Sequence, residues 1–234
     1  MKQSSESVRN WKELLLGEAL LLGVLSKIMQ NEPEREWIES LIREDVFSEL
    51  PLDAKNRDIE TGLSLLQRWS SKNRDGLGMD TLLDLRADHT NLFVGVGKAV
   101  AAPWESVYFN EDRMIFQEQT LQIREWYRRF GLETKKLHKE PDDHIGLELS
   151  FLAHLAGLGL QAVETKDVAG LEHSLQAQRQ FLHDHPLRWV KFWSSSVEEH
   201  AKTDLYRGTA MLTRGVLMAL AEILGVEMPE EIAQ

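Results

Sequence analysis

Apolar residues recur at intervals of three and four along most of this chain, and no other feature limits its possible folds as strongly. The pattern is clearest in two segments: Trp37, Leu41, Ile42 and Phe47, and then Ile59, Leu63, Leu66 and Trp69. This spacing places side chains on one face of a helix, whereas strands show alternation bounded by turn residues, which is missing here. The sequence therefore predicts an all-α fold.

The expected helices follow one another with chemically reasonable breaks. A leucine-rich helix is expected over Trp11–Met29, and later helices at about 111–130, 142–163, 166–184, 187–201 and 203–225. The breaks fall at residues 31–33, Pro51, residues 73–78, Gly131, Pro141 and Pro186. Because the segments are too irregular for a coiled coil, we expect a single domain over residues 1–234. It should be an irregular bundle of about nine to eleven helices.

The charge balance narrows the possible partners. Lys and Arg number 27 against 38 Asp and Glu, which gives a net charge of −11. Nonspecific nucleic-acid binding and docking to anionic lipid both need clustered cations, so neither is expected. A basic peptide remains compatible with this surface. The chain has no cysteine, which excludes disulfides, thiolate metal sites and cysteine nucleophiles.

The first helix resembles a signal peptide only superficially. Glu13 and Glu18 interrupt it, and its uncharged part, Ala19–Ser26, is too short to cross a bilayer. We therefore expect a cytoplasmic protein without stable membrane insertion.

An acidic corner precedes the most apolar segment of the chain. Its residues are Glu140, Pro141, Asp142, Asp143 and His144, and the apolar run covers 147–160. Proline and acids both favour a helix start, so a well-capped helix is one interpretation. The other is a receptor for a cationic group, with a titratable histidine beside the acids.

The connection over residues 95–108 is long and apolar. Surface loops are normally polar, and long ordered loops are often functional. Trp104 and Tyr108 either anchor this loop to the core or line a binding surface. Gly95, Gly97 and Lys98 do not form a phosphate-binding loop, because no strand precedes them and no Ser or Thr follows the lysine.

Several motifs occur in a familiar order. They are Leu92-Phe93-Val94-Gly95, Pro103-Trp104-Glu105-Ser106-Val107-Tyr108, Tyr127 with Gly131-Leu132, Glu140-Pro141-Asp142-Asp143-His144, and Phe181-Leu182 with His185-Pro186-Leu187. Together they resemble the TorD/DmsD family of redox-enzyme maturation chaperones. The resemblance covers most of the chain and is strongest between Leu92 and Leu155.

The resemblance implies a specific function. Members are all-helical cytoplasmic chaperones that bind the twin-arginine signal peptide of a molybdenum-cofactor oxidoreductase and hold the precursor until the cofactor is inserted. They do not catalyse a redox step, and we expect no bound cofactor here. The matching positions, which are our expected peptide contacts, are Leu92, Phe93, Pro103, Trp104, Glu105, Ser106, Tyr108, Asp143 and His144.

The chemistry of these residues is consistent with that function. Carboxylates bind the planar guanidinium of arginine through two parallel hydrogen bonds. The candidate carboxylates here are those of Glu140, Asp142, Asp143 and Glu105. An exposed ion pair adds only about 0–1 kcal/mol, so charge alone cannot hold a peptide. Burial of the apolar part of the leader, at roughly 25 cal/mol per Å², must supply most of the affinity. Leu92, Phe93, Trp104 and Tyr108 are the expected lining of such a groove.

Two other functions remain open. Asp142, Asp143 and His144 could perform acid–base chemistry, although no second polar cluster completes an active site. Alternatively, the chain is a general helical scaffold or regulator whose surface has no requirement for arginine. His183 and His185 lie two residues apart across an expected helix end, so they do not share a face and no metal site is expected.

The oligomeric state is also open. The glycine-rich break at residues 76–78, or the segment before Pro141, could act as a hinge for exchange between subunits. We therefore expect either a monomer or a segment-swapped homodimer.

Overall fold

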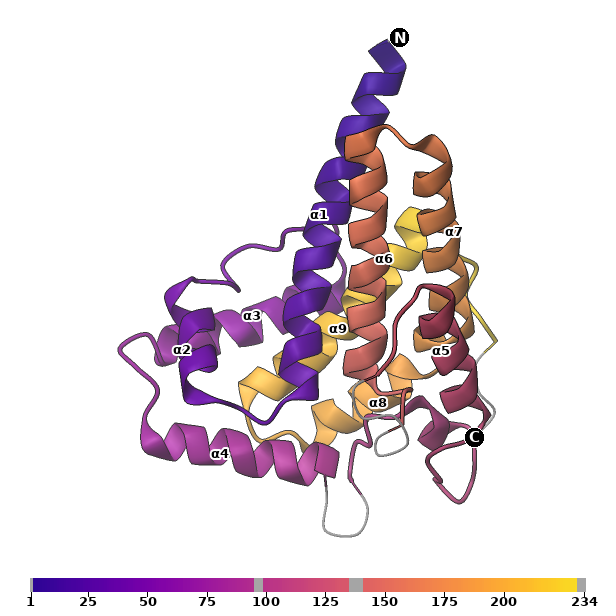
Figure 1. The fold of residues 1–234 in the computed structure, drawn as a ribbon. Coiled ribbons are helices and arrows are strands. Elements are labelled where there is room, and N and C mark those ends of the chain that lie inside the picture. Colours follow the sequence, from indigo (N-terminus) through magenta and orange to yellow (C-terminus); the bar gives the residue numbers. More distant parts are fainter. Residues whose placement is uncertain (1, 95–98, 135–140, 231–234) are drawn as a thin grey trace.

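The computed structural model describes residues 2–94, 99–134 and 141–230, and side chains from Trp11 onward (Figure 1). Within these ranges the chain forms nine α-helices and two short helical turns, and it contains no strand. The predicted all-α bundle of nine to eleven helices is confirmed.

The helix bounds are α1 (Lys2–Gln30), α2 (Arg35–Arg43), α3 (Arg57–Lys72), α4 (Met79–His89), α5 (Glu118–Arg129), α6 (Ile145–Thr165), α7 (Val168–Asp184), α8 (Pro186–His200) and α9 (Asp204–Leu224). A π-helical turn, η1, covers Thr90–Val94, and a 3-10 helix, η2, covers Glu105–Tyr108.

Local sequence signals set several helix ends. Asn56 caps α3 by accepting a hydrogen bond from the N–H of Ile59 at 2.9 Å. Pro186 is in the first turn of α8, where its missing N–H costs nothing. Gly225 ends α9 with a φ of 70°, a left-handed conformation that glycine adopts without steric cost.

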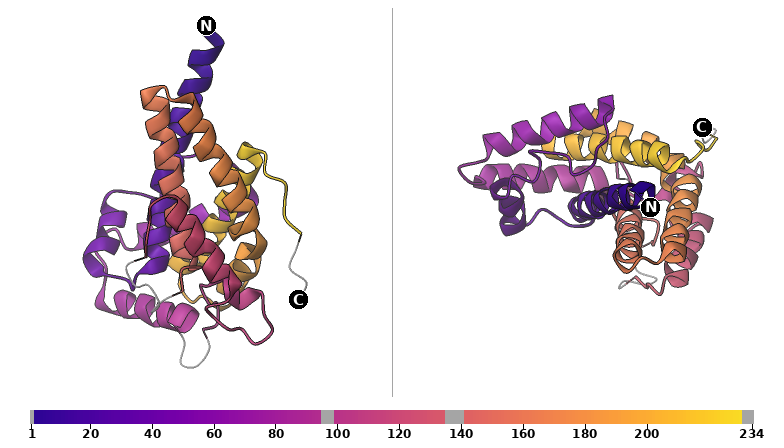
Figure 2. Two further views of the ribbon diagram at one scale, coloured as in Figure 1. Left: turned by 45° about the vertical axis from the view of Figure 1, so that its right-hand side comes forward. Right: turned by 90° about the horizontal axis from the view of Figure 1, so that it is seen from above.

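The helices form two connected groups. The long helices α1, α6 and α7 stand side by side, and α9 crosses behind them, where it packs on α3 and α8 (Figures 1 and 2). Helices α2, α3 and α4 lie on one side of α1, and α5 lies on the other side of the molecule, in front of α7 and α8. Most of α9 is buried, so this helix is part of the core.

Large aromatic side chains fill the centre of the bundle. Phe151, Phe181, Trp189 and Trp193 are each at most 2% exposed. Helix α6 is long and apolar enough to cross a membrane, but 56% of its apolar window is buried inside the protein. Its neighbours are α1 and α7, so its composition is that of a core helix.

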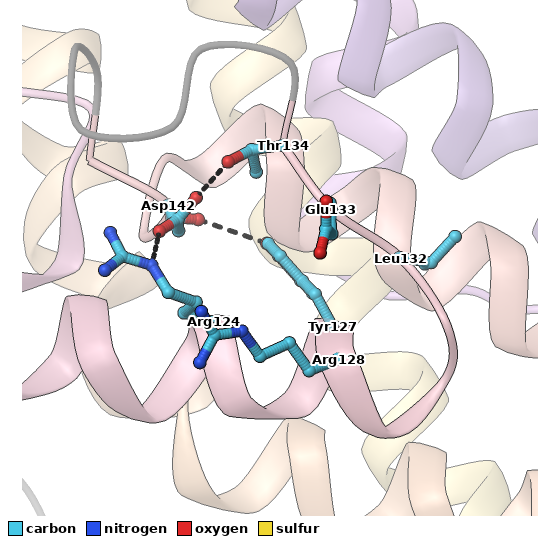
Figure 3. Close-up of a pocket in the computed structure, with 7 residues that line it drawn as sticks. All are labelled: Arg124, Tyr127, Arg128, Leu132, Glu133, Thr134 and Asp142. Atoms are coloured by element: carbon cyan, nitrogen blue, oxygen red, sulfur yellow. Dashed lines mark hydrogen bonds and ion pairs between the residues drawn. The ribbon is translucent and has the colours of Figure 1, made fainter.

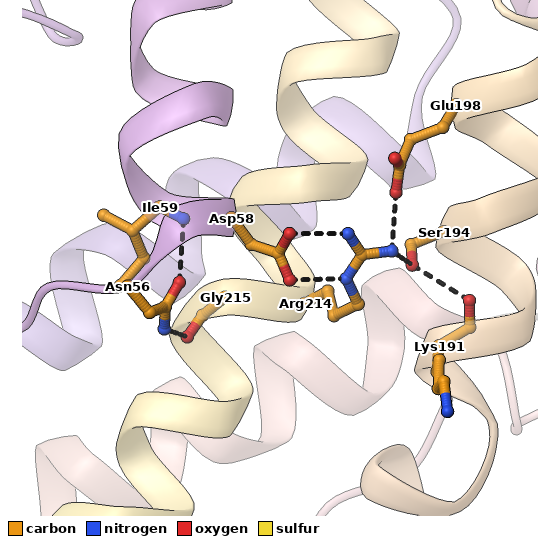
Figure 4. A network of polar contacts seen from close by, with 8 residues as sticks. All are labelled: Asn56, Asp58, Ile59, Lys191, Ser194, Glu198, Arg214 and Gly215. Atoms are coloured by element: carbon orange, nitrogen blue, oxygen red, sulfur yellow. Dashed lines mark hydrogen bonds and ion pairs between the residues drawn. The ribbon is translucent and has the colours of Figure 1, made fainter.

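Close contact between α3 and α9 depends on glycine and on one arginine. A Cβ at Gly62 would lie 2.6 Å from the backbone nitrogen of Leu212, so only glycine fits there. Nearby, Arg214 on α9 binds both carboxylate oxygens of Asp58 on α3 at 2.6 Å (Figure 4). The same guanidinium reaches Glu198 and Ser194 on α8, and thus joins three helices.

The helix predicted over 111–130 begins only at Glu118, so its first part was wrong. Residues 111–117 form a loop in which Arg113 and Phe116 have φ angles of 53° and 61°. The side chain of Asn110 pairs with both backbone polar groups of Met114 and thereby stabilises this loop. The apolar spacing around Met114 thus resembled a helix without forming one.

Candidate functional site

The loop before α5 and the acidic corner before α6 pair directly through their backbones. Trp104 and His144 form an isolated antiparallel bridge. The N–H of Glu105 donates to the carbonyl of Asp143 at 2.9 Å, and the N–H of Ile145 donates to the carbonyl of Pro103 at 2.8 Å. The structure therefore joins the two segments that the sequence singled out separately.

Asp143 is the buried centre of this junction. Its carboxylate is 0% exposed. One oxygen accepts from the N–H of Ser106 at 2.7 Å and the other from the hydroxyl of Thr120 at 2.6 Å. Because Ser106 lies on η2 and Thr120 on α5, this single side chain holds both elements against the start of α6.

Asp142 is buried beside it and makes a second set of contacts (Figure 3). Its carboxylate accepts from Nε of Arg124 at 2.6 Å and from the hydroxyl of Thr134. Its carbonyl accepts from the hydroxyl of Tyr127 at 3.1 Å. The cavity among these groups measures only about 10 Å³, which is room for no more than one water. Asp142 therefore fastens α5 and the segment after it to the corner.

Glu105 and Glu148 extend the buried acidic cluster into the core. Both are 0% exposed. Glu105 contacts Nδ1 of His185 at 3.0 Å, and Glu148 accepts from the indole of Trp189 at 3.3 Å. Burial raises the pKa of Glu105, against the hydrogen bond from His185. Burial, and then repulsion from Glu105 and Asp143, raises the pKa of Glu148 well above its ordinary value.

His144 caps the following helix. Its Nδ1 accepts from the N–H of Gly146 at 3.0 Å, which supports the interpretation of this corner as a helix start. Its ring also packs edge-on against Trp104, with 6.1 Å between the centroids. Both side chains are half-buried, so part of each faces solvent.

The other predicted contact residues belong mainly to the interior. Leu92 and Phe93 are buried in η1, and Phe93 packs against Tyr206. Tyr108 packs against Trp189, and its hydroxyl donates to the carbonyl of Ala102 at 2.9 Å. Pro103 and Ser106 are buried, and Glu140 lies outside the described residues.

The structure thus changes the role expected for the acids. Asp142, Asp143 and Glu105 do not offer free carboxylates at the surface. Partners inside the protein bind both oxygens of Asp142 and Asp143, and Glu105, which contacts His185, is fully buried. Contact between these residues and a bound peptide stays a prediction. Their contacts fix the two segments that carry the half-buried pair, Trp104 and His144.

A groove of about 600 Å³ lies between α5 and the residues where α7 ends and α8 begins. Trp126 and Leu121 contribute apolar surface, and His185, which contacts Glu105, connects the groove to the buried acids. The remaining lining residues are Gln122, Glu125, Arg129, Gln180, His183, Asp184 and Arg188. The sequence did not predict this groove, because its walls come from segments about 60 residues apart.

Sequence reasoning also missed several residues of the junction. Thr120 and Arg124 carry no special signal on an ordinary amphipathic helix. Glu148 did carry one, since it is an acid inside an apolar run. His183 pairs with Asp184, and the described residues contain no cluster of three His, Cys, Asp or Glu able to hold a metal.

Known proteins are similar to this chain in sequence and in fold. The family model described as nitrate reductase delta subunit matches residues 53–194. The chaperone protein TorD of Vibrio cholerae is 28% identical over 196 residues, which cover 78% of this chain and 87% of the relative. TorD of Actinobacillus pleuropneumoniae (serotype 7) is 27% identical over 173 residues, covering 74% of this chain and 75% of that protein.

A solved structure from Archaeoglobus fulgidus, described as a redox enzyme maturation protein, has a similar fold. It superposes with a TM-score of 0.50 at 17% identity, and the match covers 86% of this chain and 93% of that one. The family match spans more than half of the sequence and includes the loop, η2 and the acidic corner. This chain therefore belongs to the nitrate reductase delta subunit family, and with it to the TorD/DmsD family of redox-enzyme maturation chaperones.

Proposed function

We propose that this protein is a cytoplasmic chaperone for a molybdenum-cofactor oxidoreductase. It binds the twin-arginine leader of the precursor and holds it until the cofactor is inserted, before export. The relatives that match most of the chain are named chaperones, which supports a maturation role. The peptide-binding part of this proposal rests on one observation, the backbone pairing of Trp104 with His144.

The paired segments with Trp104 and His144 have the properties of a rigid surface for peptide binding. Hydrogen bonds to the buried acids fix these segments, so Trp104 and His144 lose little conformational freedom when a peptide binds. The indole N–H of Trp104 has no hydrogen-bond acceptor in the described structure. A backbone carbonyl of a bound leader would satisfy it, if a small shift of the ring exposed that group.

The geometry favours this function over acid–base catalysis. Asp142 and Asp143 are buried and fully engaged, and Nδ1 of His144 is used as a helix cap. A general acid or base must reach a proton on its substrate. These carboxylates reach only partners within the protein, and their contacts stabilise the loop.

A binding titration with the full chain tests the proposal. A labelled synthetic peptide with two adjacent arginines and a leucine-rich stretch should bind in fluorescence anisotropy. Trp104→Ala should weaken binding by about tenfold or more, since a central tryptophan often contributes 1–2 kcal/mol or more at an interface. The same peptide with both arginines changed to alanine should bind distinctly less well. Equal binding of the two peptides would instead favour a general apolar scaffold.

A further inference from the structure

The segment that follows η2 exposes an unusual amount of apolar surface. Met114, Ile115 and Phe116 are 50%, 39% and 44% exposed, and Leu121, in the first turn of α5, is 60% exposed. We call these four residues the 114–121 patch. Single exposed apolar residues are common, but four within eight positions of the chain leave an unusual amount of apolar surface in contact with water.

Specific hydrogen bonds hold this loop in the conformation that exposes its apolar side chains. Asn110 donates to the carbonyl of Ser106 at 2.7 Å and accepts from the N–H of Met114 at 2.7 Å. Ser106 is in turn held through its own N–H by the buried Asp143. A chain of hydrogen bonds therefore runs from the buried acid at the junction to the exposed loop.

The backbone is strained where the patch is most apolar. Phe116 has a φ of 61°, and a bulky side chain in this left-handed region is a steric outlier. Such strain persists only where the surroundings enforce it, and it is concentrated at functional sites. Here it accompanies an aromatic residue that is almost half exposed.

The charges beside the patch indicate the chemistry of a partner. Glu111 and Asp112 are exposed, and their side chains make no ion pair or hydrogen bond within the described structure. The nearby cations are already placed on aromatic rings: Arg113 lies 6.0 Å from the centre of Tyr108, and Arg188 lies 4.5 Å from that of Phe109. The loop thus combines free acids with an apolar surface, which fits a segment that is both cationic and apolar.

We propose that this surface, rather than the buried corner, receives most of the leader. The apolar stretch of the leader lies on the 114–121 patch and continues into the groove beside Leu121 and Trp126, while Glu111 and Asp112 face its arginines. This inference rests on the proposed function and assigns a large part of the binding energy, beside the contribution of Trp104, to residues that the sequence analysis did not select. A second copy of this chain fits less well, because each copy carries a net charge of −11 and would bring its free acids against their equivalents.

Phe116→Gly provides the sharpest test, because it separates folding from binding. Glycine accepts the left-handed backbone, so the thermal midpoint should stay the same or rise. Loss of the ring should nevertheless weaken binding of the labelled arginine–leucine peptide by about tenfold. If Phe116 served only the fold, this substitution would not weaken peptide binding while leaving the thermal midpoint unchanged or higher.

Two matched comparisons support that test. Leu121→Gln should weaken peptide binding several-fold, whereas Leu83→Gln on α4, where the leucine is 53% exposed, should not. The double change Glu111→Gln and Asp112→Asn should weaken binding and flatten its dependence on salt. The exposed acids Asp75 and Asp84 serve as the control pair, as Asp75→Asn with Asp84→Asn.

The outcomes distinguish this inference from the proposed function. If the unaltered protein binds the peptide and the Phe116, Leu121 and acid variants bind it equally well, the patch is not the leader site, although the chaperone function stands. If the unaltered protein does not bind the peptide, the proposed function fails and the inference fails with it. If light scattering shows that Phe116→Gly turns a dimer into a monomer without affecting peptide binding, the patch is a contact between copies and the inference is overturned.

Discussion

Replacement of Asp143 tests whether the buried acid organises the junction. Asp143→Ala removes two hydrogen bonds to a charged acceptor, and it leaves the N–H of Ser106 and the hydroxyl of Thr120 buried without a partner. Each such loss costs about 1–3 kcal/mol. Relief of the repulsion that Asp143 exerts on Glu105 and Glu148 offsets part of this. We expect a net loss of about 3 kcal/mol for alanine and about 1–2 kcal/mol for asparagine, which keeps one acceptor.

Urea unfolding followed by circular dichroism would measure these losses. With a slope of roughly 3 kcal/mol per molar urea for a chain of this size, Asp143→Ala should lower the midpoint by about 1 M. Asp167→Ala is a suitable control, because Asp167 makes a single exposed capping bond, at 2.9 Å, to Gly170. Loss of such a cap costs about 1 kcal/mol, so its midpoint should fall much less.

Either of two results would refute this reasoning. If Asp143→Asn left the midpoint unchanged but abolished leader binding and its salt dependence, the charge of Asp143 would be acting on the peptide, as the sequence alone suggested. If Asp143→Ala were no less stable than Asp167→Ala, the two buried hydrogen bonds would not hold the junction together.

Three further predictions concern the bundle. Burial raises the pKa of Glu18 from 4.5 to about 8, so its contribution to stability is largest below pH 4.5 and is lost as the pH rises through 8. Glu18→Gln should flatten that part of the pH profile in urea titrations. Arg214→Lys should cost about 1–3 kcal/mol in the same assay, because lysine cannot bind Asp58 with two parallel bonds. Gly62→Ala should lower the thermal midpoint, since its Cβ would meet the α9 backbone, whereas Gly23→Ala, with open space around it, should raise stability by about 0.5–1 kcal/mol.

The helical architecture was predictable because its signals are local. Periodic apolar residues define α3, and proline and glycine mark the ends of α8 and α9. The loop at 111–117 was not predictable in this way. Its apolar residues have helix-like spacing, but the side chain of Asn110 competes for the backbone of Met114 and turns the chain.

The candidate site was predictable as a set of segments but not as a surface. The motif order identified the loop with Trp104 and the corner with His144, and the structure places them in one backbone pairing. The sequence could not show that Asp142 and Asp143 face inward, because an acid before a helix is compatible with either side. That choice depends on Arg124, Thr120 and Ser106, which come from other segments of the chain.

The sequence by itself determined the helical class, the chaperone family and the absence of cysteine chemistry, since each depends on residue types and their order along the chain. Only the tertiary structure decided which acids are hydrogen-bonded inside the protein and which remain free for a partner. Burial decides this, because a carboxylate that loses its contact with water must gain hydrogen bonds from other residues, including residues distant in sequence. Asp143 is buried and accepts hydrogen bonds from Ser106 and Thr120, whereas Glu111 and Asp112 lie exposed near Phe116 in the sequence.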